Sequence, residues 1–304
     1  ENRVSIWQMG TRSIGAGDIH GDGWPDLVVA NDSYSGGATL FANLGGQRFA
    51  AQDLDLGLLT HEPIGLTAFV DLDNDGWLDL FLASFRQGSF WIRNHKGDFT
   101  REKPQILTRH QYSCVAAAGF ADLNQDGRLD PVMGNWTVGG ANVETREGAP
   151  LSSQNEILFS TDEGGFKAHL LPEEPGETLS ILLSDINHDG WSDLLVGNDL
   201  DEPDFIYLGD EALSLTPVSK QENLLPFTPH FNMGYESADL DNDLRFELLA
   251  VGIASGGLDR AREVGLNRKE FAEKIEDPTL RSQHLQYDEQ VQHYSTVVDS
   301  RSVL

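Results

Sequence analysis

Short apolar runs recur along most of the chain, and each follows a segment rich in aspartate. The runs read DLVVAN at 26–31, DLFLAS at 79–84, DPVMGN at 130–135, DLLVGN at 193–198 and ELLAVG at 247–252. Further apolar runs precede most of these segments, for example IGLTAFV at 64–70 and LSILLS at 179–184. Because short apolar runs bounded by Gly, Asn and Asp are typical of strands, the pattern predicts a β-rich chain.

The aspartate-rich segments share one nine-residue pattern, D-x-[DNH]-x-D-G-x-x-[DE]. We call them loops one to five, and they cover residues 18–26, 71–79, 122–130, 185–193 and 239–247. Their first acids are 51 to 63 residues apart. A second β-rich run and a turn follow in most units, as in ATLFANLGG at 38–46 and SFWIRNHKG at 89–97. Four short strands in a repeat of about 50 residues are typical of a β-propeller blade.

The repeat divides the chain into two parts. Residues 1–257 are predicted to be all-β, forming a β-propeller of four-stranded blades that carry the five loops. Residues 258–295 are rich in Ala, Glu, Lys, Leu and Arg and contain Pro278, so we expect one or two short helices near the C-terminus. The last residues of the 258–304 part resemble the start of a further blade. We therefore expect the natural polypeptide to continue past Leu304, or another chain to complete the ring.

Composition narrows the classes of partner. The formal net charge is −28, so nucleic acids and anionic membrane surfaces are excluded as favourable partners by Coulomb repulsion. No run of about 20 apolar residues occurs, so membrane insertion is not expected. The single cysteine, Cys114, cannot form a disulfide within the chain.

The acids concentrate in the loops, which hold 17 of the 49 acidic residues. Oxygen ligands from positions 1, 3 and 5, the position 7 carbonyl and the position 9 acid would suit Ca²⁺, and glycine at position 6 permits the turn. The predicted ligand sets are Asp18, His20 (or a water), Asp22, Trp24 and Asp26; Asp71, Asp73, Asp75, Trp77 and Asp79; Asp122, Asn124, Asp126, Arg128 and Asp130; Asp185, Asn187, Asp189, Trp191 and Asp193; and Asp239, Asp241, Asp243, Arg245 and Glu247.

The loop pattern has two alternatives to a calcium loop of this kind. An EF-hand requires a bidentate Glu at position 12, which is Val29, Leu82, Met133, Val196 or Ala250 here. A metal-free acidic turn remains open for any single loop, but five repeated copies favour a bound ion. Loops one and five are the weakest candidates, because His20 is a poor calcium ligand and Leu244 replaces the glycine.

At these loops the chain resembles the FG-GAP/VCBS-repeat family of integrin-α-like β-propellers, over about residues 10–257. The units GDIHGDGWPDLVVAND, LFANLGGQRF and PHFNMGYESADLDND resemble its bacterial and cartilage-acidic-protein branch, often associated with an ASPIC/UnbV domain. The resemblance implies a metal-binding, secreted or surface-exposed repeat protein that acts in cell adhesion or in protein or carbohydrate binding. The departures are His20, Leu244 and Glu247.

A second, speculative site would lie at the mouth of the propeller channel. His61, His110 and His230 each precede an inner strand, 10, 12 and 9 residues before the first acid of the next loop, and Arg12 occupies the comparable place in the first unit. Three imidazoles that converge could bind a transition metal or a substrate. The alternative is that these histidines bond to the backbone at strand ends.

The predicted function is that of a calcium-stabilised extracellular, cell-surface or periplasmic module that binds a protein or a carbohydrate. Two alternatives stay open. One is a polysaccharide-active lyase or hydrolase with its site at the channel mouth. The other is a structural subunit of a larger complex. Trp24, Trp77 and Trp191 of the loops are predicted to pack between neighbouring blades.

Overall fold

The computed structural model describes residues 11–31, 36–84, 87–108, 114–136, 154–173, 176–199, 203–213, 217–218, 228, 232–243, 245–254 and 292–298. The chain divides into two compact units, Glu1–Thr178 and Leu179–Leu304. Each unit is described by itself below.

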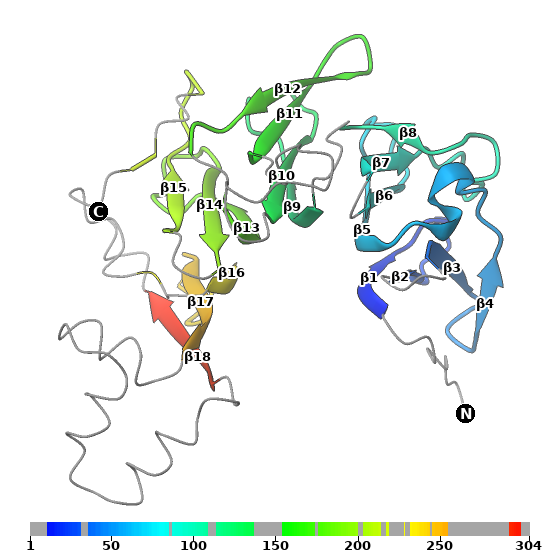
Figure 1. Cartoon of the computed structure of the whole chain (residues 1–304), viewed down its shortest axis with the longest axis horizontal. Helices are drawn as coiled ribbons and strands as arrows, with labels where there is room; N and C mark the ends of the chain where they lie inside the picture. Colours follow the sequence, from blue (N-terminus) through cyan, green and yellow to red (C-terminus); the bar gives the residue numbers. More distant parts are fainter. Residues whose placement is uncertain are drawn as a thin grey trace, which may run out of the picture. The chain divides into compact units, whose positions relative to one another are not determined.

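Unit one contains three four-stranded antiparallel sheets, and each is a meander in chain order (Figure 1). Sheet one consists of β1 (Thr11–Gly17), β2 (Asp26–Asn31), β3 (Ala38–Asn43) and β4 (Phe49–Gln52). Sheet two consists of β5 (Ile64–Val70), β6 (Asp79–Ser84), β7 (Gly88–Ile92) and β8 (Gln105–Ile106). Sheet three consists of β9 (Cys114–Ala121), β10 (Asp130–Trp136), β11 (Glu156–Ser160) and β12 (Phe166–Leu170). A short 3-10 helix, η1 (Gly57–His61), precedes β5.

Unit two contains two three-stranded sheets. Sheet four consists of β13 (Thr178–Ser184), which starts at the unit boundary, β14 (Asp193–Asn198) and β15 (Phe205–Tyr207). An isolated bridge from Tyr207 to Pro217 adds a third, single-residue pairing to this sheet. Sheet five consists of β16 (Asn232–Ala238), β17 (Glu247–Ala254) and β18 (Gln292–Val298).

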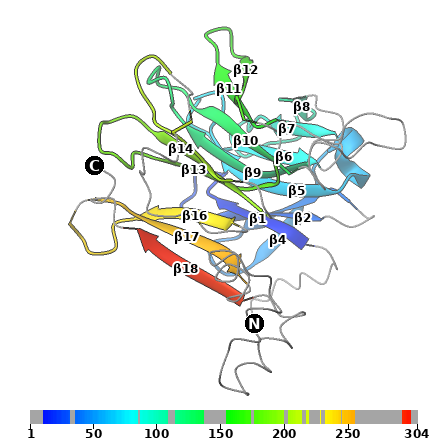
Figure 2. The same cartoon turned by 60° about the vertical axis from the view of Figure 1, so that its left-hand side comes forward.

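The second strands of sheets two and four are buried on both faces. Every residue of β6 and of β14 is buried. In unit one, Val28 and Leu80 belong to the core cluster shared by sheets one and two, and Phe81 and Met133 belong to that shared by sheets two and three. Figure 2 shows sheet two beside sheet three. Burial on both faces explains why these strands read as continuous apolar runs rather than as alternating patterns.

The approach of sheet one to sheet two depends on glycines. A Cβ added to Gly15 would lie 3.6 Å from the Cα of Ala68, and one added to Gly17 would lie 3.1 Å from the Cβ of Phe69. The backbones of β1 and β5 therefore pack more closely than larger residues would allow. The hydroxyl of Ser13 also accepts the Thr67 N–H over 3.0 Å.

The all-β prediction, with four-stranded antiparallel sheets, is confirmed. The described residues contain no α-helix, and none of their helices is long and apolar enough to span a membrane. Residues 258–291, most of the predicted helical segment, lie outside the described part. Residues 292–295, however, belong to β18 and not to a helix, because they pair with β17 along Val251–Ala254. The further blade expected at 299–304 also lies outside the described residues.

Candidate metal centre

The five loops occupy equivalent places, each joining the first and second strands of its sheet. Position four has a left-handed backbone in every loop, with φ of 67° at Gly21 and 55° to 62° at Asn74, Gln125, His188 and Asn242. The glycine at position six is also left-handed in loops one to four, with φ of 86° to 91°. The glycine predicted for the turn is therefore required by the backbone in these loops. Leu244 of loop five lies outside the described residues.

The carboxylate at position one organises the turn by accepting backbone hydrogen bonds. Asp71 accepts the N–H of Asp75 over 3.0 Å and the N–H of Gly76 over 2.9 Å. Asp18, Asp122 and Asp185 accept the equivalent pair, and Asp239 accepts the N–H of Asp243. These donors lower the pKa of Asp18. Each first acid is thus held in place before any ion binds.

The acid at position five also caps the turn. In all five loops its Oδ1 accepts the N–H of position seven, over 2.9 Å at Trp24, Trp77 and Trp191 and 3.0 Å at Arg128 and Arg245. These bonds orient the residues whose carbonyls were predicted as ligands. The ligand role of those carbonyls stays a prediction.

The acid at position nine is buried and holds two parts of the backbone together. Oδ2 of Asp79 accepts the N–H of Leu72, over 3.0 Å, and its Oδ1 accepts the N–H of Asn94, over 2.8 Å. Leu72 is the second residue of loop two, and Asn94 follows β7, the third strand of the sheet. Asp26, Asp130 and Asp193 accept equivalent pairs from Ile19 and Asn43, Leu123 and Ser160, and Ile186 and Gly209. We call this arrangement the clasp.

Burial in the clasp disfavours ionisation. It raises the pKa of Asp79 to about 7 and that of Asp193 to about 6, and it raises the pKa of Asp130 in the same direction. Burial also raises the pKa of Asp73, against the attraction of the Arg93 guanidinium. A cation bound beside these groups would favour the charged carboxylates.

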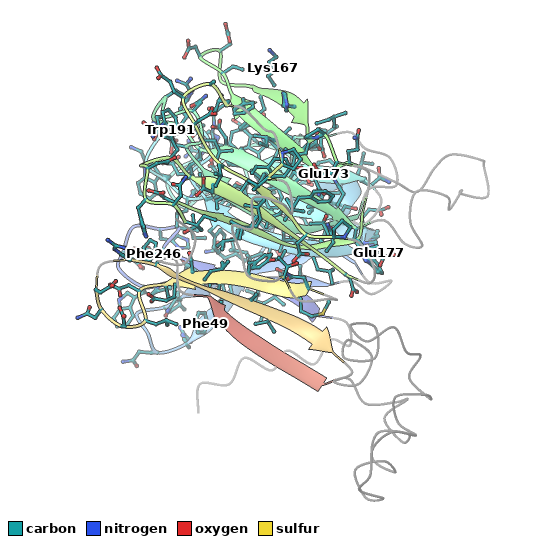
Figure 3. All side chains as sticks on the ribbon, turned by 90° about the vertical axis from the view of Figure 1, so that its left-hand side faces the viewer. Phe49, Lys167, Glu173, Glu177, Trp191 and Phe246 are labelled. Carbon is teal, nitrogen blue, oxygen red and sulfur yellow. The ribbon has the colours of Figure 1, made fainter. Side chains whose placement is uncertain are left out.

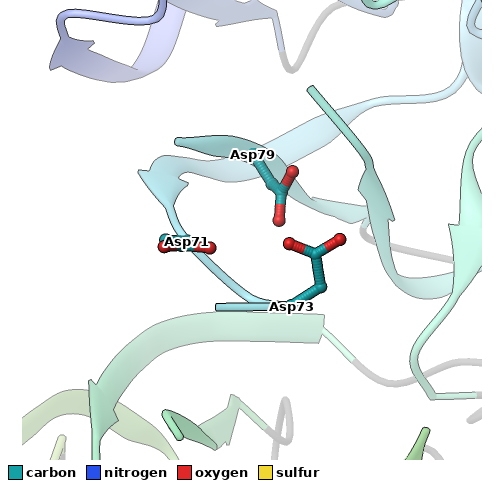
Figure 4. A group of neighbouring side chains, drawn as sticks. All are labelled: Asp71, Asp73 and Asp79. Atoms are coloured by element: carbon teal, nitrogen blue, oxygen red, sulfur yellow. The ribbon is translucent and has the colours of Figure 1, made fainter. Parts of the chain in front are cut away.

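In loops two and five the acids converge. Asp71, Asp73 and Asp79 each place one ligand atom within 4.8 Å of the others, as do Asp239, Asp241 and Glu247. Figure 4 shows the carboxylates of Asp73 and Asp79 facing each other. Oxygens on opposite sides of a calcium ion lie about 5 Å apart, so both groups match its size.

The oxygens of loop five supply a further test of the fit. Glu247 is buried, with 6% of its surface exposed, and its Oε2 accepts the N–H of Leu240 over 2.7 Å. Its Oε1 has no hydrogen-bond partner in the described part of the chain. A buried carboxylate oxygen beside two other acids fits a metal ligand. Although the sequence predicted loop five to be weak, its acids converge as those of loop two do.

Loops three and four carry asparagine at position three. The Oδ1 atoms of Asn124 and Asn187 both accept the position-five N–H over 3.0 Å, and their amide groups donate to Asp126 and Asp189. Their predicted role as calcium ligands stays a prediction.

Two arginines lie beside the loops, and the sequence pattern did not indicate one of them, Arg93. Arg93, which follows β7, forms an ion pair with Asp73 over 2.5 Å and stacks 5.5 Å from the centre of the Trp91 ring. Arg128, itself in loop three, pairs with Asp126 over 2.6 Å and with Asp162 over 3.0 Å. No local pattern links Arg93 to loop two, because the two are joined only by strand pairing.

Neighbouring loops of unit one contact each other. A Cβ on Gly21 would lie 3.3 Å from the Trp77 ring, so loop two packs against loop one. The amide of Asn74 donates to the carbonyl of Gly127 in loop three over 3.1 Å. Trp77 thus packs between sheets as predicted, whereas Trp24 lies against Gly46 of its own sheet and is 46% exposed. In unit two, Figure 3 places Trp191 in loop four and Phe246 in loop five, where Phe246 is 50% exposed.

The predicted channel site is not tested. His61 is exposed at the end of η1. His110 and His230 lie outside the described residues, as does the side chain of Arg12. Their convergence stays a prediction.

Comparison with known proteins identifies one repeat. A family model described as FG-GAP-like repeat matches residues 71–133, from loop two to the middle of β10. A search of curated proteins found no match. The FG-GAP resemblance is therefore confirmed for this segment, and the narrower branch suggested by the sequence stays a prediction.

Two solved structures are similar at low identity. The V. cholerae biofilm matrix protein Bap1 is 16% identical with a TM-score of 0.48, and the match covers 81% of this chain and 35% of Bap1. BBS1N, solved in complex with ARL6DN, is 14% identical with a TM-score of 0.42, and the match covers 78% of this chain and 60% of BBS1N. This chain therefore spans about a third and three fifths of these two chains.

Proposed function

We propose that the chain is a calcium-stabilised, extracellular β-propeller module that binds a protein or a carbohydrate. The observation that carries the proposal is the convergence of three acids in loop two, repeated with the same positions in loop five. Asp71, Asp73 and Asp79 would hold one ion, and Asp239, Asp241 and Glu247 another. The ion would supply positive charge that neutralises the buried carboxylates.

The donor set favours calcium over other divalent ions. The converging atoms are all carboxylate oxygens, which suit Ca²⁺ or Mg²⁺ better than Zn²⁺. Backbone N–H groups already occupy part of the acceptor capacity of each acid. A large ion with flexible geometry tolerates such shared oxygens better than Mg²⁺, which requires a near-ideal octahedron.

Three features support the propeller and extracellular parts of the proposal. Each sheet is a meander in chain order, and the second strands of sheets two and four are buried along their whole length, which suits a blade. The FG-GAP-like match spans the link between sheets two and three. A site for calcium on repeated surface loops also suits the extracellular space, where modules bind Ca²⁺ with dissociation constants of about 0.1–1 mM.

Thermal melting in calcium and in chelator tests the calcium part. Excess Ca²⁺ should raise the melting temperature, because ion binding to the folded state alone stabilises it by about 2.7 kcal/mol per site at a hundredfold excess over Kd. Mg²⁺ at equal concentration should raise it less. Asp71→Asn should reduce the calcium response, and Asp53→Asn, a surface change outside the loops, should not. An unchanged melting temperature in chelator would contradict the calcium role.

The binding part needs a separate experiment. A glycan array and a pull-down from an extracellular fraction, both in calcium, should give a ligand that is retained without turnover. Release of new reducing or unsaturated ends from a polysaccharide would instead support the enzyme alternative. Co-purification of one stoichiometric partner would support a structural subunit.

A further inference from the structure

We propose that loop one holds no calcium ion and that the imidazole of His20 takes its place. The proposal rests on the calcium role proposed for the other loops. Position three is Asp73, Asn124, Asn187 and Asp241 in loops two to five, and each of these side chains offers an oxygen. His20 offers two ring nitrogens and no oxygen.

The first step concerns the bond between His20 and the last acid of its own loop. Nδ1 of His20 lies 2.9 Å from Oδ2 of Asp26, which also accepts the N–H of Ile19 over 3.1 Å. A carboxylate oxygen has two lone-pair sites, so these two donors fill Oδ2. Oδ1 accepts the N–H of Asn43 over 2.7 Å. In loop one, the imidazole of His20 therefore faces the Asp26 carboxylate. In loop two, the equivalent carboxylate of Asp79 faces that of Asp73 (Figure 4).

The second step concerns the other ring nitrogen. Because Oδ2 of Asp26 is an acceptor, Nδ1 of His20 carries the proton. Nε2 then accepts from the side-chain amide of Gln52, 3.2 Å away on β4. Both nitrogens are engaged, so the ring in this position offers no lone pair to a metal ion. The proposal therefore departs from the sequence-based assignment of His20, or a water, as a ligand at position three.

The third step concerns the freedom of the ring to move aside. A Cβ on Gly97, in the turn after β7 of sheet two, would lie 2.7 Å from Cδ2 of His20. The Gly97 N–H is bonded to Asn94 over 2.6 Å, and the Asn94 amide donates to the carbonyl of Ile19 over 2.9 Å. The turn of sheet two is thus tied to loop one and packs against the imidazole of His20. This packing holds the imidazole against Asp26.

The acids of loop one agree with this assignment. All of loop one is described, yet the three-acid groups with atoms within 4.8 Å are those of loops two and five. Asp18 and Asp22 still form the turn through their backbone bonds. Loop one therefore keeps the shape of the repeated turn, but its acids do not converge as those of loops two and five do. It also lacks the position-three oxygen that Asn124 and Asn187 supply in loops three and four.

Counting bound calcium in the full chain by equilibrium dialysis tests the proposal. His20→Asp and His20→Asn should each add one equivalent over the unmodified protein, because each restores an oxygen at position three. Asn124→Asp, the matched control in loop three, should add none. Two further variants test the proposal without creating a new site. Asp18→Asn should leave the number of bound calcium ions unchanged, whereas Asp71→Asn should lower it by one.

Hydrogen exchange gives an independent measure. Chelation should leave the protection of the Ile19 and Asn43 amides unchanged and reduce that of the Leu72 and Asn94 amides. The proposal is overturned if Asp18→Asn removes one equivalent, or if the folded His20→Asp protein binds no more calcium than the unmodified chain. If neither the His20→Asp protein nor the unmodified chain binds any calcium, the proposed calcium function fails as well. Failure of the loop-one proposal alone can therefore be told apart from failure of the calcium function.

Discussion

The backbone N–H of Asn94 donates to Oδ1 of Asp79 over 2.8 Å, and Asp79 is fully buried. The same carboxylate accepts the N–H of Leu72, so a single side chain ties the start of loop two to the end of β7. Asp26, Asp130 and Asp193 do the same in their own sheets. The acid at position nine is therefore a structural element even without an ion.

Replacing this carboxylate should destabilise the protein in chelator. Asp79→Asn presents an amide N–H₂ to one of the two backbone donors, which leaves a buried N–H without an acceptor at a cost of about 1–3 kcal/mol. Chemical denaturation in excess chelator measures the loss. Asp75→Asn, an exposed acid of the same loop, should have a smaller effect, and equal losses would show that the clasp has no special role.

The metal-free protein should lose stability as the pH rises from about 4 to 7. The folded-state pKa of Asp79 is about 7 and that of Asp193 about 6, both raised by burial from 3.8. The folded state then binds more protons than the unfolded state in this window, so its stability is greatest at the acid end and is lost as the pH approaches the raised values. Urea denaturation in chelator at several pH values measures the slope. Asp79→Asn should flatten it, and a metal-free stability that rises over this range would contradict the assignment.

Removing Arg93 should strengthen calcium binding to loop two. Its guanidinium lies 2.5 Å from Oδ2 of Asp73, where it occupies a ligand oxygen and repels a cation. Arg93→Met keeps an apolar side chain over Trp91, and we expect a gain in affinity of about fivefold, or roughly 1 kcal/mol. Calorimetric titration with calcium measures it. Arg101→Met, which breaks the exposed pair with Asp98, is the control and should leave the affinity unchanged.

Gly17 should not tolerate even one methyl group. A Cβ there would lie 2.8 Å from Cδ1 of Leu78 and 3.1 Å from the Cβ of Phe69, so Gly17→Ala should cost about 1–3 kcal/mol through overpacking. Gly165→Ala is the matched control, because its Cβ would lie 3.7 Å from the nearest atom, the hydroxyl of Thr161. A fall in melting temperature for the control but not for Gly17→Ala would contradict the packing of sheet one on sheet two.

Much of this architecture could be read from the sequence because it depends on local chemistry. The strands around loop two are runs of apolar residues, and the turn needs a left-handed residue at Gly76. The repetition of both along the chain indicated one kind of unit. Short-range periodicity and turn geometry were sufficient for these features.

The partners of the loop acids could not be read in the same way. Asn94 and Arg93 reach loop two only because β7 pairs with β6, and this pairing brings them to Asp79 and Asp73, which lie 15 and 20 positions earlier in the chain. One signal was present, since Asn43 and Asn94 each precede a glycine by three residues and bond to its N–H. The role of His20 was hidden for the same reason, because Gln52 and Gly97 come from other strands and turns.

Loop two contacts both of its neighbours, through Trp77 on Gly21 and through Asn74 on Gly127. An ion that orders loop two would also order these two contact points. The binding of a second ion to loop three would then cost less conformational entropy. Calcium should then load loops two and three with positive cooperativity, and the saturation curve should be steeper than that of independent sites.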